Sequence, residues 1–156
     1  MKWDLETVMN STWGDYMEDF TPITVEKIVG IFNSAKSILV DDFIWFAYKD
    51  GIPIALTVAF PDVNQLLAYF DGKLNFWQAV KFMYLKRKKT VTRNRVLLAG
   101  VTPEFQNSGV IAAMFLQFVR AMKRREEYTE MELSWVGDYN PRMRKIYEQI
   151  GGVHMK

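Results

Sequence analysis

Cysteine is absent from the 156-residue chain, and histidine occurs once, at His154. Without thiols the chain has neither a disulfide framework nor a thiolate metal site, and one histidine excludes a His-based metal site. We therefore expect no bound metal. A chain without cysteine suits a reducing compartment, so we expect a cytoplasmic protein.

Long apolar runs are also absent. No stretch approaches the roughly 20 apolar residues of a membrane helix, and the first six residues contain no apolar core of signal-peptide length. We therefore expect no membrane partner. The formal net charge of +2 is too small to indicate a nucleic-acid partner. With 49% hydrophobic and 24% charged residues, the chain has the composition of one globular domain with a sizeable core.

The most informative stretch covers residues 95–112. Residues 95–102 have the pattern of a buried strand, a short polar elbow follows, and an amphipathic helix runs from about residue 108 to 124. Ser108 and Gly109 leave little side-chain bulk over the backbone amides at the start of this helix. Unpaired amides and the positive end of the helix dipole meet there, which predicts a phosphate-binding junction.

The remaining pattern predicts helices and strands on both sides of this junction. A helix is expected over residues 3–19, and a second helix is expected to begin after its cap, Thr24. Strands over residues 43–48 and 52–60 flank Asp50-Gly51, a strong hairpin signal, and Pro53 indicates an edge or a bulge. The apolar positions of the first helix are Trp3, Leu5, Val8, Met9, Trp13, Tyr16 and Met17.

Downstream, a short helix ending at Gly72 precedes a helix over residues 75–87 that Asn75 caps. The second of these has little polar surface, so it is either mostly buried or lines an apolar groove. A strand over residues 130–136 and a helix from Asn140-Pro141 to Gly151 complete the pattern. The order predicts an α/β fold, a mixed sheet with helices on both faces.

Two motifs resemble those of the GCN5-related N-acetyltransferase (GNAT) superfamily. Residues 106–111, Gln-Asn-Ser-Gly-Val-Ile, resemble its Q/R-x-x-G-x-G/A pyrophosphate loop, and Asn140, Tyr147 and Gly151 resemble its N-x6-Y-x3-G helix. The resemblance extends from the second helix to the end of the chain and implies a GNAT-like acyl-CoA acyltransferase fold. Residues 11–14, 20–24 and 132–135 further resemble the C-terminal domains of larger bacterial GNAT proteins.

The chain departs from the family pattern at three places. Ile111 stands where the loop usually has Gly or Ala, and residues 3–19 read as a helix where the family has its first strand. The sequence stops at residues 152–156, where a further strand would begin. We therefore expect one GNAT-like domain over residues 1–156 that lacks the last strand or strands, as in a fragment or a truncated member.

The resemblance implies transfer of acetyl from acetyl-CoA to a primary amine by direct attack in a ternary complex. Tyr147 would be the general acid, and the backbone N–H of Val101 would polarise the thioester carbonyl. No general base is assigned among Glu104, Glu132, Asp62 and water. The residues implied in binding coenzyme A are Gly100, Val101, Gln106, Asn107, Ser108, Gly109, Val110, Ile111 and Asn140.

Simpler structural roles remain open for the same residues. Gly109 could only permit a tight turn, Asn140 is explained as an N-cap, and Tyr147 could be a core tyrosine. The basic runs at residues 86–89 and 123–125 are solvated helix ends or attract the 3′-phosphate of coenzyme A. The tryptophans considered as core residues or as the lining of an acceptor pocket are Trp45, Trp77 and Trp135.

Two other functions compete with acetyl transfer to a small-molecule amine. The donor could be a longer acyl or acyl-carrier-protein thioester, with residues 75–85 lining the acyl groove. Alternatively, the chain is a non-catalytic GNAT-like module that forms a homodimer or pairs with another domain through an exposed sheet edge. Binding of acetyl-CoA and of longer thioesters distinguishes these functions.

Overall fold

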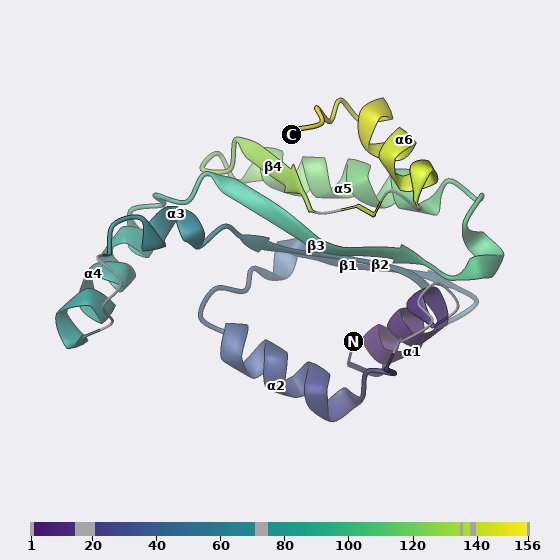
Figure 1. Cartoon of the computed structure of the whole chain (residues 1–156), viewed down its shortest axis with the longest axis horizontal. Coiled ribbons are helices and arrows are strands. Elements are labelled where there is room, and N and C mark those ends of the chain that lie inside the picture. The colour runs from purple at the N-terminus through teal and green to yellow at the C-terminus, as the bar shows by residue number, and fades with distance from the viewer. Residues whose placement is uncertain (1, 15–20, 71–74, 135, 138–139, 156) are drawn as a thin grey trace.

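A four-stranded mixed sheet forms the centre of the computed structural model, which describes residues 2–14, 21–70, 75–134, 136–137 and 140–155. Helices cover both faces of the sheet, as Figure 1 shows, so the predicted α/β class is confirmed. The elements are α1 (Lys2–Trp13), α2 (Val25–Ala35), η1 (Asp41–Phe43), β1 (Ile44–Lys49), β2 (Ile52–Pro61), α3 (Asn64–Leu67), α4 (Phe76–Arg87), β3 (Arg93–Val101), η2 (Pro103–Phe105), α5 (Val110–Arg124), β4 (Glu130–Leu133) and α6 (Pro141–Gln149).

The strands lie in the order β1-β2-β3-β4. The β1–β2 and β2–β3 pairs are antiparallel, and β3 pairs with β4 in parallel. Asp50 and Gly51 connect β1 to β2 with φ angles of +50° and +81°, which confirms the predicted hairpin. The register shifts opposite Pro53, so the bulge expected there is present.

The parallel pairing of β3 and β4 covers only part of β3. Residues 93–96 pair with residues 130–133, and the Ser134 N–H donates to the Val96 carbonyl at 3.2 Å. Beyond Val96, the described residues place only β2 beside β3. The last residues of β3 therefore have one open edge close to the elbow that leads into α5.

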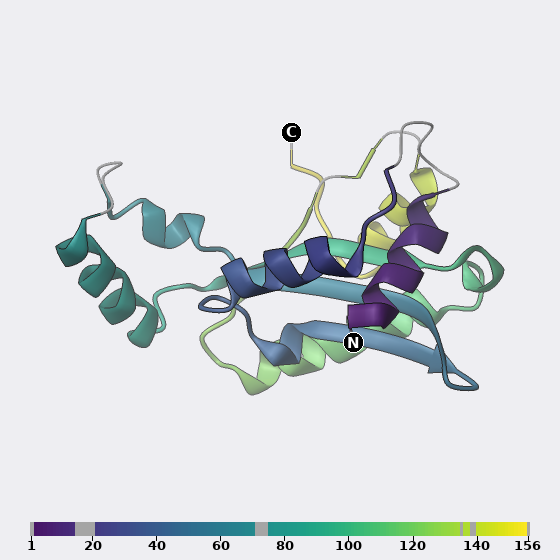
Figure 2. The ribbon, with the colours of Figure 1, turned by 90° about the horizontal axis from the view of Figure 1, so that it is seen from below.

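Two hydrophobic clusters hold the helices against the sheet. On one face, Phe115 and Phe118 of α5 pack with Phe43, whose ring centroid lies 5.1 Å from that of Phe118. On the other face, Leu5 and Val8 of α1 and Ile28 of α2 pack against β2. Figures 1 and 2 show α5 and α6 on one side of the sheet and α1 and α2 on the other. Helices therefore pack against both faces of the sheet that contains β3.

Three predicted helix caps are confirmed by hydrogen bonds. The Thr24 hydroxyl accepts from the Lys27 N–H at 3.5 Å, and the Asn75 side chain accepts from the Gln78 N–H at 3.0 Å. The Asn140 side chain accepts from the Met143 N–H at 3.1 Å. Each cap satisfies a backbone donor of the first helical turn.

Of the two alternatives left open for residues 75–87, burial is wrong. No residue of α4 is buried, and Phe76 and Trp77 are 74% and 76% exposed, so Trp77 is not a core residue. The reason is tertiary, because α3 and α4 project beyond the sheet (Figures 1 and 2). Among the described residues, no helix combines the length and apolar content needed to cross a bilayer.

Some predicted boundaries also differ. Helix α1 ends at Trp13 instead of residue 19, and β4 ends at Leu133 instead of residue 136. Several residues of the sequence-based prediction lie outside the described ranges: Tyr16, Met17, Phe20, Gly72 and Trp135.

Candidate active site

A pocket of about 100 Å³ lies beside the open edge of β3. Five of the predicted coenzyme-binding residues line it: Gly100, Val101, Gln106, Ile111 and Asn140. They come from the end of β3, the elbow, the first turn of α5 and the cap of α6. Residues separated by 40 positions in the sequence thus meet in one cavity.

The elbow turns into α5 through Gly109, whose φ of +78° is in the left-handed region. The first backbone bond of the helix runs from the Ala113 N–H to the Gly109 carbonyl at 3.1 Å. Inside the elbow, the Ser108 N–H donates to the Phe105 carbonyl, and the Val110 N–H donates to the Ser108 hydroxyl. The strand-to-helix junction has the predicted form.

These internal hydrogen bonds leave fewer backbone amides of the elbow available to bind a ligand. The amide of Gln106 also has an internal acceptor, the Pro103 carbonyl at 3.4 Å. For the amides of Asn107, Gly109 and Ile111, the described ranges contain no acceptor. Asn107, Ser108 and Gly109 are exposed, so an anion can reach this part of the elbow.

Ile111 does not cover these amides. Its side chain is 4% exposed and packs in the α5 core cluster, while also forming part of the pocket wall. The larger side chain at this position, unusual for the motif it resembles, is therefore accommodated in the interior. The exposed backbone of residues 107–109 stays accessible.

The backbone of Val101 faces the open edge of β3. In an antiparallel ladder, alternate residues direct their N–H and C=O groups to the same neighbouring strand. The Thr102 N–H donates to the Ile54 carbonyl of β2 at 2.9 Å, so the preceding residue, Val101, directs its N–H away from β2. This N–H lies on the edge beside the pocket, the position from which it could polarise a carbonyl.

The end of α1 closes the pocket over Gly100. A Cβ atom at Gly100 would lie 2.7 Å from Cη2 of Trp13 and 3.0 Å from Cγ2 of Thr12. Glycine is therefore required for this close approach of helix and strand. The Thr12 hydroxyl is buried and has no hydrogen-bond partner in the described ranges. Sequence reasoning assigned neither Thr12 nor Trp13 to the site, because only the packing of α1 on β3 brings them there.

Arg142 is a further residue that sequence reasoning missed. It lines the pocket from the first turn of α6, and its Nη1 donates to Oε1 of Gln106 at 3.2 Å. This contact joins α6 to the elbow. The available signal was its place two residues after Asn140, next to the predicted helix motif. An arginine beside the elbow adds a positive charge where an anionic group is expected.

Tyr147 lies on the inner face of α6, next to the pocket-lining residue Ile146. Its ring packs edge-on against Phe115 with centroids 5.6 Å apart, and it is not among the pocket-lining residues. Burial raises the pKa of Tyr147 to about 12 from an ordinary value of 10. The phenol therefore keeps its proton at neutral pH, and its role as general acid stays a prediction.

The carboxylates considered as general bases lie elsewhere. Asp62 follows β2 at the end of the sheet far from Val101 and pairs with Arg93 at 3.5 Å. Glu132 pairs with Arg95 at 3.1 Å, and Glu104 is exposed in η2. None of the described residues that line the pocket carries a carboxylate.

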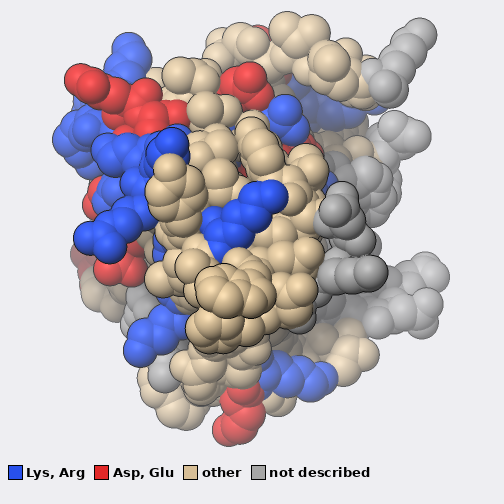
Figure 3. Space-filling model, turned by 90° about the vertical axis from the view of Figure 1, so that its left-hand side faces the viewer, with Lys and Arg blue, Asp and Glu red and all other residues tan. Residues whose placement is uncertain are grey.

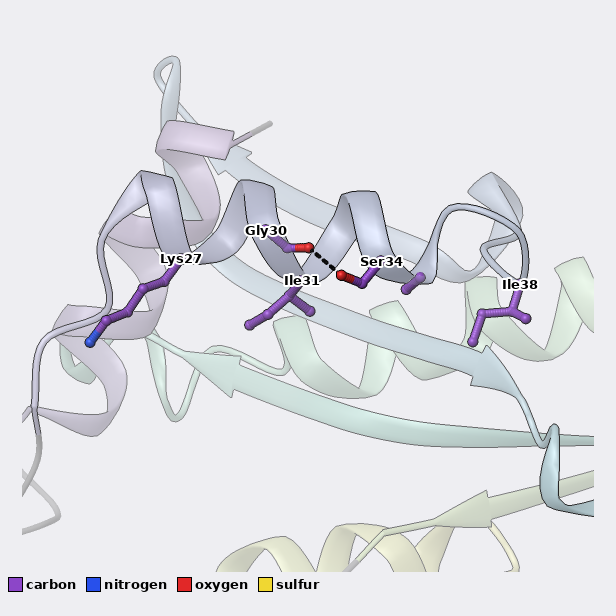
Figure 4. A pocket seen from close by; sticks show the side chains of 6 residues that line it. Lys27, Gly30, Ile31, Ser34 and Ile38 are labelled. Atoms are coloured by element: carbon purple, nitrogen blue, oxygen red, sulfur yellow. Dashed lines mark hydrogen bonds between the residues drawn. The ribbon is translucent and has the colours of Figure 1, made fainter. Parts of the chain in front are cut away.

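A second, open hollow follows the outer face of α2 (Figure 4). Its one charged group is Lys27, and the Ser34 hydroxyl donates to the Gly30 carbonyl of the same helix at 2.9 Å. None of the predicted site residues lies there, so the pocket at β3 is the candidate active site. The α2 hollow is lined by Lys27, Gly30, Ile31, Ser34, Ala35 and Ile38.

A mixed sheet with an open edge on its third strand, followed by a glycine elbow and a helix, is the arrangement of the GNAT fold. The chain matches the aminoglycoside acetyltransferase AAC(6')-Iy bound to a CoA bisubstrate analogue, with a TM-score of 0.59, 15% identity, and coverage of 99% of this chain and 86% of that one. It also matches the GNAT-like decarboxylase GphF in complex with isobutyryl-CoA, with a TM-score of 0.56, 15% identity, and coverage of 99% and 75%. The chain has the GNAT fold, which confirms the predicted resemblance.

Two curated proteins are more similar in sequence. The bacterial ceramide synthase of Caulobacter vibrioides (strain NA1000 / CB15N) is 30% identical over 155 residues, 97% of this chain and 40% of that protein. Protein YghO of Escherichia coli (strain K12) is 29% identical over 150 residues, 94% of this chain and 38% of that protein. The chain thus spans about two fifths of the length of these relatives. No protein-family model matches it.

Proposed function

We propose that the chain is an N-acyltransferase that uses an acyl-CoA thioester as donor and a primary amine as acceptor. The observation that carries this proposal is the pocket that joins the open edge of β3 to the glycine elbow of α5. The elbow offers amides to a pyrophosphate, and the β3 edge offers N–H and C=O groups to an amide-containing arm. A thioester of coenzyme A presents both features.

In the proposed reaction, the amine nitrogen attacks the thioester carbonyl carbon. The C–N bond forms and the C–S bond breaks after the carbonyl oxygen has carried negative charge, which the Val101 N–H stabilises. The thiolate leaves with a proton from Tyr147, and the new amide nitrogen loses its proton to water. Arg142 and the amides of Asn107, Gly109 and Ile111 hold the donor while both reactants share one cleft.

The donor chain in the leading proposal is short. Trp13 lies against Gly100 at the end of α1 and narrows the pocket beside the proposed thioester position, which favours an acetyl group. A specific observation favours a second candidate, a longer acyl donor: the relative with 30% identity is named a bacterial ceramide synthase. A ceramide is the amide of a fatty acid and a long-chain base, so a related site could take both a longer donor and a lipophilic amine.

Isothermal titration calorimetry with CoA, acetyl-CoA and palmitoyl-CoA tests the proposal. We expect all three ligands to release heat on binding to the pocket, and acetyl-CoA to be turned over when primary amines are supplied. Tighter binding and faster turnover of palmitoyl-CoA would select the longer donor. No binding of any of the three at millimolar concentration would contradict the acyltransferase, and binding without turnover of any donor would support a non-catalytic module.

Gly109 provides a sharper test of the elbow. Gly109→Ala is expected to cost about 1 kcal/mol of folding free energy, because alanine at a φ of +78° is strained. It is also expected to raise the Kd for CoA by about tenfold, because the strained turn moves the donor amides. Thermal denaturation and calorimetry measure the two effects.

The matched control is Gly51→Ala in the β1–β2 hairpin. Gly51 has a φ of +81° and, like Gly109, open space at its Cβ position. We expect the same loss of stability with no change in CoA affinity. An unchanged Kd in Gly109→Ala, or equal losses of affinity in both variants, would remove the elbow from the binding site.

A further inference from the structure

The exposed face of α4 is a continuous apolar stripe. Phe76, Trp77, Val80, Met83 and Tyr84 are between 48% and 76% exposed and follow one another at the i, i+1, i+4, i+7, i+8 spacing of one helical face. The opposite face of the helix packs inward, where Phe82 lies 6.4 Å from the ring of Phe70. The stripe therefore lies on the outer face of α4, while the inner face of the helix packs against Phe70.

The charged residues within the α4 segment of the sequence are all cations. Between Asn75 and Thr92 the sequence contains five cations, Lys81, Lys86, Arg87, Lys88 and Lys89, and no carboxylate. Seen from the end of the molecule at which α4 lies, Lys and Arg side chains lie within and beside a broad uncharged area, and Asp and Glu side chains lie further out on the same face (Figure 3). The Lys88 ammonium lies 4.9 Å above the ring of Tyr84, so cation and apolar stripe adjoin directly.

Two contacts attach the C-terminal end of this helix to the rest of the molecule. Lys86 donates to the Ser37 carbonyl, and Lys89 pairs with Glu127 at 3.2 Å. The capping box between Asn75 and Gln78 closes the other end. The stripe is thus presented on a capped helix whose C-terminal end is attached to the rest of the molecule.

We propose that α4 is a peripheral docking helix for an anionic lipid surface, with its apolar stripe in the interface and its cations at the headgroups. Trp and Tyr beside aliphatic side chains, flanked by Lys and Arg, are the combination that such helices use. A nucleic acid would match the cations but would leave Val80 and Met83 without apolar contacts. The five cations of this segment are complementary to acidic lipid headgroups.

This inference goes beyond the proposed acyl transfer and does not depend on it. The α3–α4 projection adjoins the start of β3, whereas the pocket lies at the other end of that strand (Figure 1). From the sequence we expect no membrane partner, because no run is long enough to span a bilayer. A helix that lies flat in the interface needs no such run.

Co-sedimentation with lipid vesicles tests the docking helix. The purified chain is mixed with vesicles of phosphatidylcholine and phosphatidylglycerol, and in parallel with vesicles of phosphatidylcholine alone. We expect the chain to sediment with the anionic vesicles, to bind neutral ones at least about tenfold more weakly, and to be released from the anionic ones by added salt.

Paired variants separate the contribution of the apolar rings to vesicle binding from that of the cations. Phe76→Ala/Trp77→Ala is expected to reduce anionic-vesicle binding by about tenfold or more, because the two largest exposed rings are lost. Trp3→Ala is its control, since Trp3 is 72% exposed on α1. Arg87→Gln/Lys88→Gln is expected to weaken binding and flatten its salt dependence, whereas Lys27→Gln/Lys145→Gln removes equal charge elsewhere and should leave binding unchanged.

Three results would overturn the proposal. The first is no sedimentation of the wild-type chain with anionic vesicles. The second is equal binding by the α4 variants and their controls, and the third is a dimer in lipid-free solution that Phe76→Ala/Trp77→Ala dissociates, which would make the stripe an interface between copies. Circular dichroism establishes that each variant folds, and the exposure of all substituted side chains makes folding the expected outcome.

Discussion

Tyr147→Phe is expected to lower the turnover of acyl transfer by about 100-fold or more while leaving the Kd for CoA unchanged. A positioned proton donor contributes about 10²–10⁴ in rate, and phenylalanine removes the hydroxyl without removing the ring that packs on Phe115. Steady-state kinetics with acetyl-CoA and a primary amine, together with calorimetry, measure the two quantities. The variant should therefore lower kcat without weakening donor binding.

Tyr128→Phe is the matched control. Its ring is also packed edge-on in the core, 5.1 Å from Phe43, and burial raises the pKa of Tyr128 as well. We expect its turnover to equal that of the wild type. Unchanged turnover in Tyr147→Phe would assign Tyr147 to the core alone, and equal losses in both variants would indicate a structural effect.

The pH dependence of Tyr147 has a definite sign. Its pKa is raised from 10 to about 12 in the folded state, so the folded state binds this proton more tightly than the unfolded chain does. The resulting stabilisation is fully present below pH 10 and is lost as the pH rises to about 12. Tyr147→Phe should therefore reduce the loss of stability across this interval, as thermal denaturation at several pH values would measure.

Trp13→Ala is expected to shift donor preference toward longer acyl chains. The indole forms the wall of the pocket above Gly100, and its removal opens space directly beside the proposed thioester position. We expect the ratio of kcat/KM for octanoyl-CoA to that for acetyl-CoA to rise by about tenfold or more, since each accommodated methylene contributes on the order of 1 kcal/mol. Competition between the two donors measures this ratio.

Trp45→Ala controls for the loss of a large ring. Trp45 is half-buried on β1, packs against the α5 core cluster and does not line the pocket. Its loss should destabilise the chain without changing the donor ratio. A donor ratio that stays constant in Trp13→Ala, or that rises equally in Trp45→Ala, would contradict the role of Trp13 in chain-length selection.

Local signals explain why much of the fold followed from the sequence. The Asp50-Gly51 turn and the caps at Thr24, Asn75 and Asn140 depend on hydrogen bonds and φ angles within a few residues, so they were predictable. The elbow at Gly109 belongs to the same class, because its left-handed φ is a property of one residue. These short-range features also carried the predicted anion-binding junction.

Burial of α4 could not be predicted in this way. Its composition is apolar on nearly every side, which in isolation favours a core helix. Whether such a helix is buried depends on which other elements pack against it. In this fold α4 projects beyond the sheet. The same sequence feature, read with the fold, indicates an interaction surface.

The residues of the candidate site also fall into two groups, those predictable from the local sequence and those placed by tertiary packing. The sequence alone determined the glycine elbow, the strand that precedes it and the Asn140 cap, because each depends on neighbours in the chain. The packing of α1 on β3 and of α6 on the elbow decided that Trp13 and Arg142 complete the pocket and that Asp62 lies far from it. The contact between Trp13 and Gly100 joins positions 100 − 13 = 87 residues apart, and no local periodicity encodes such a contact.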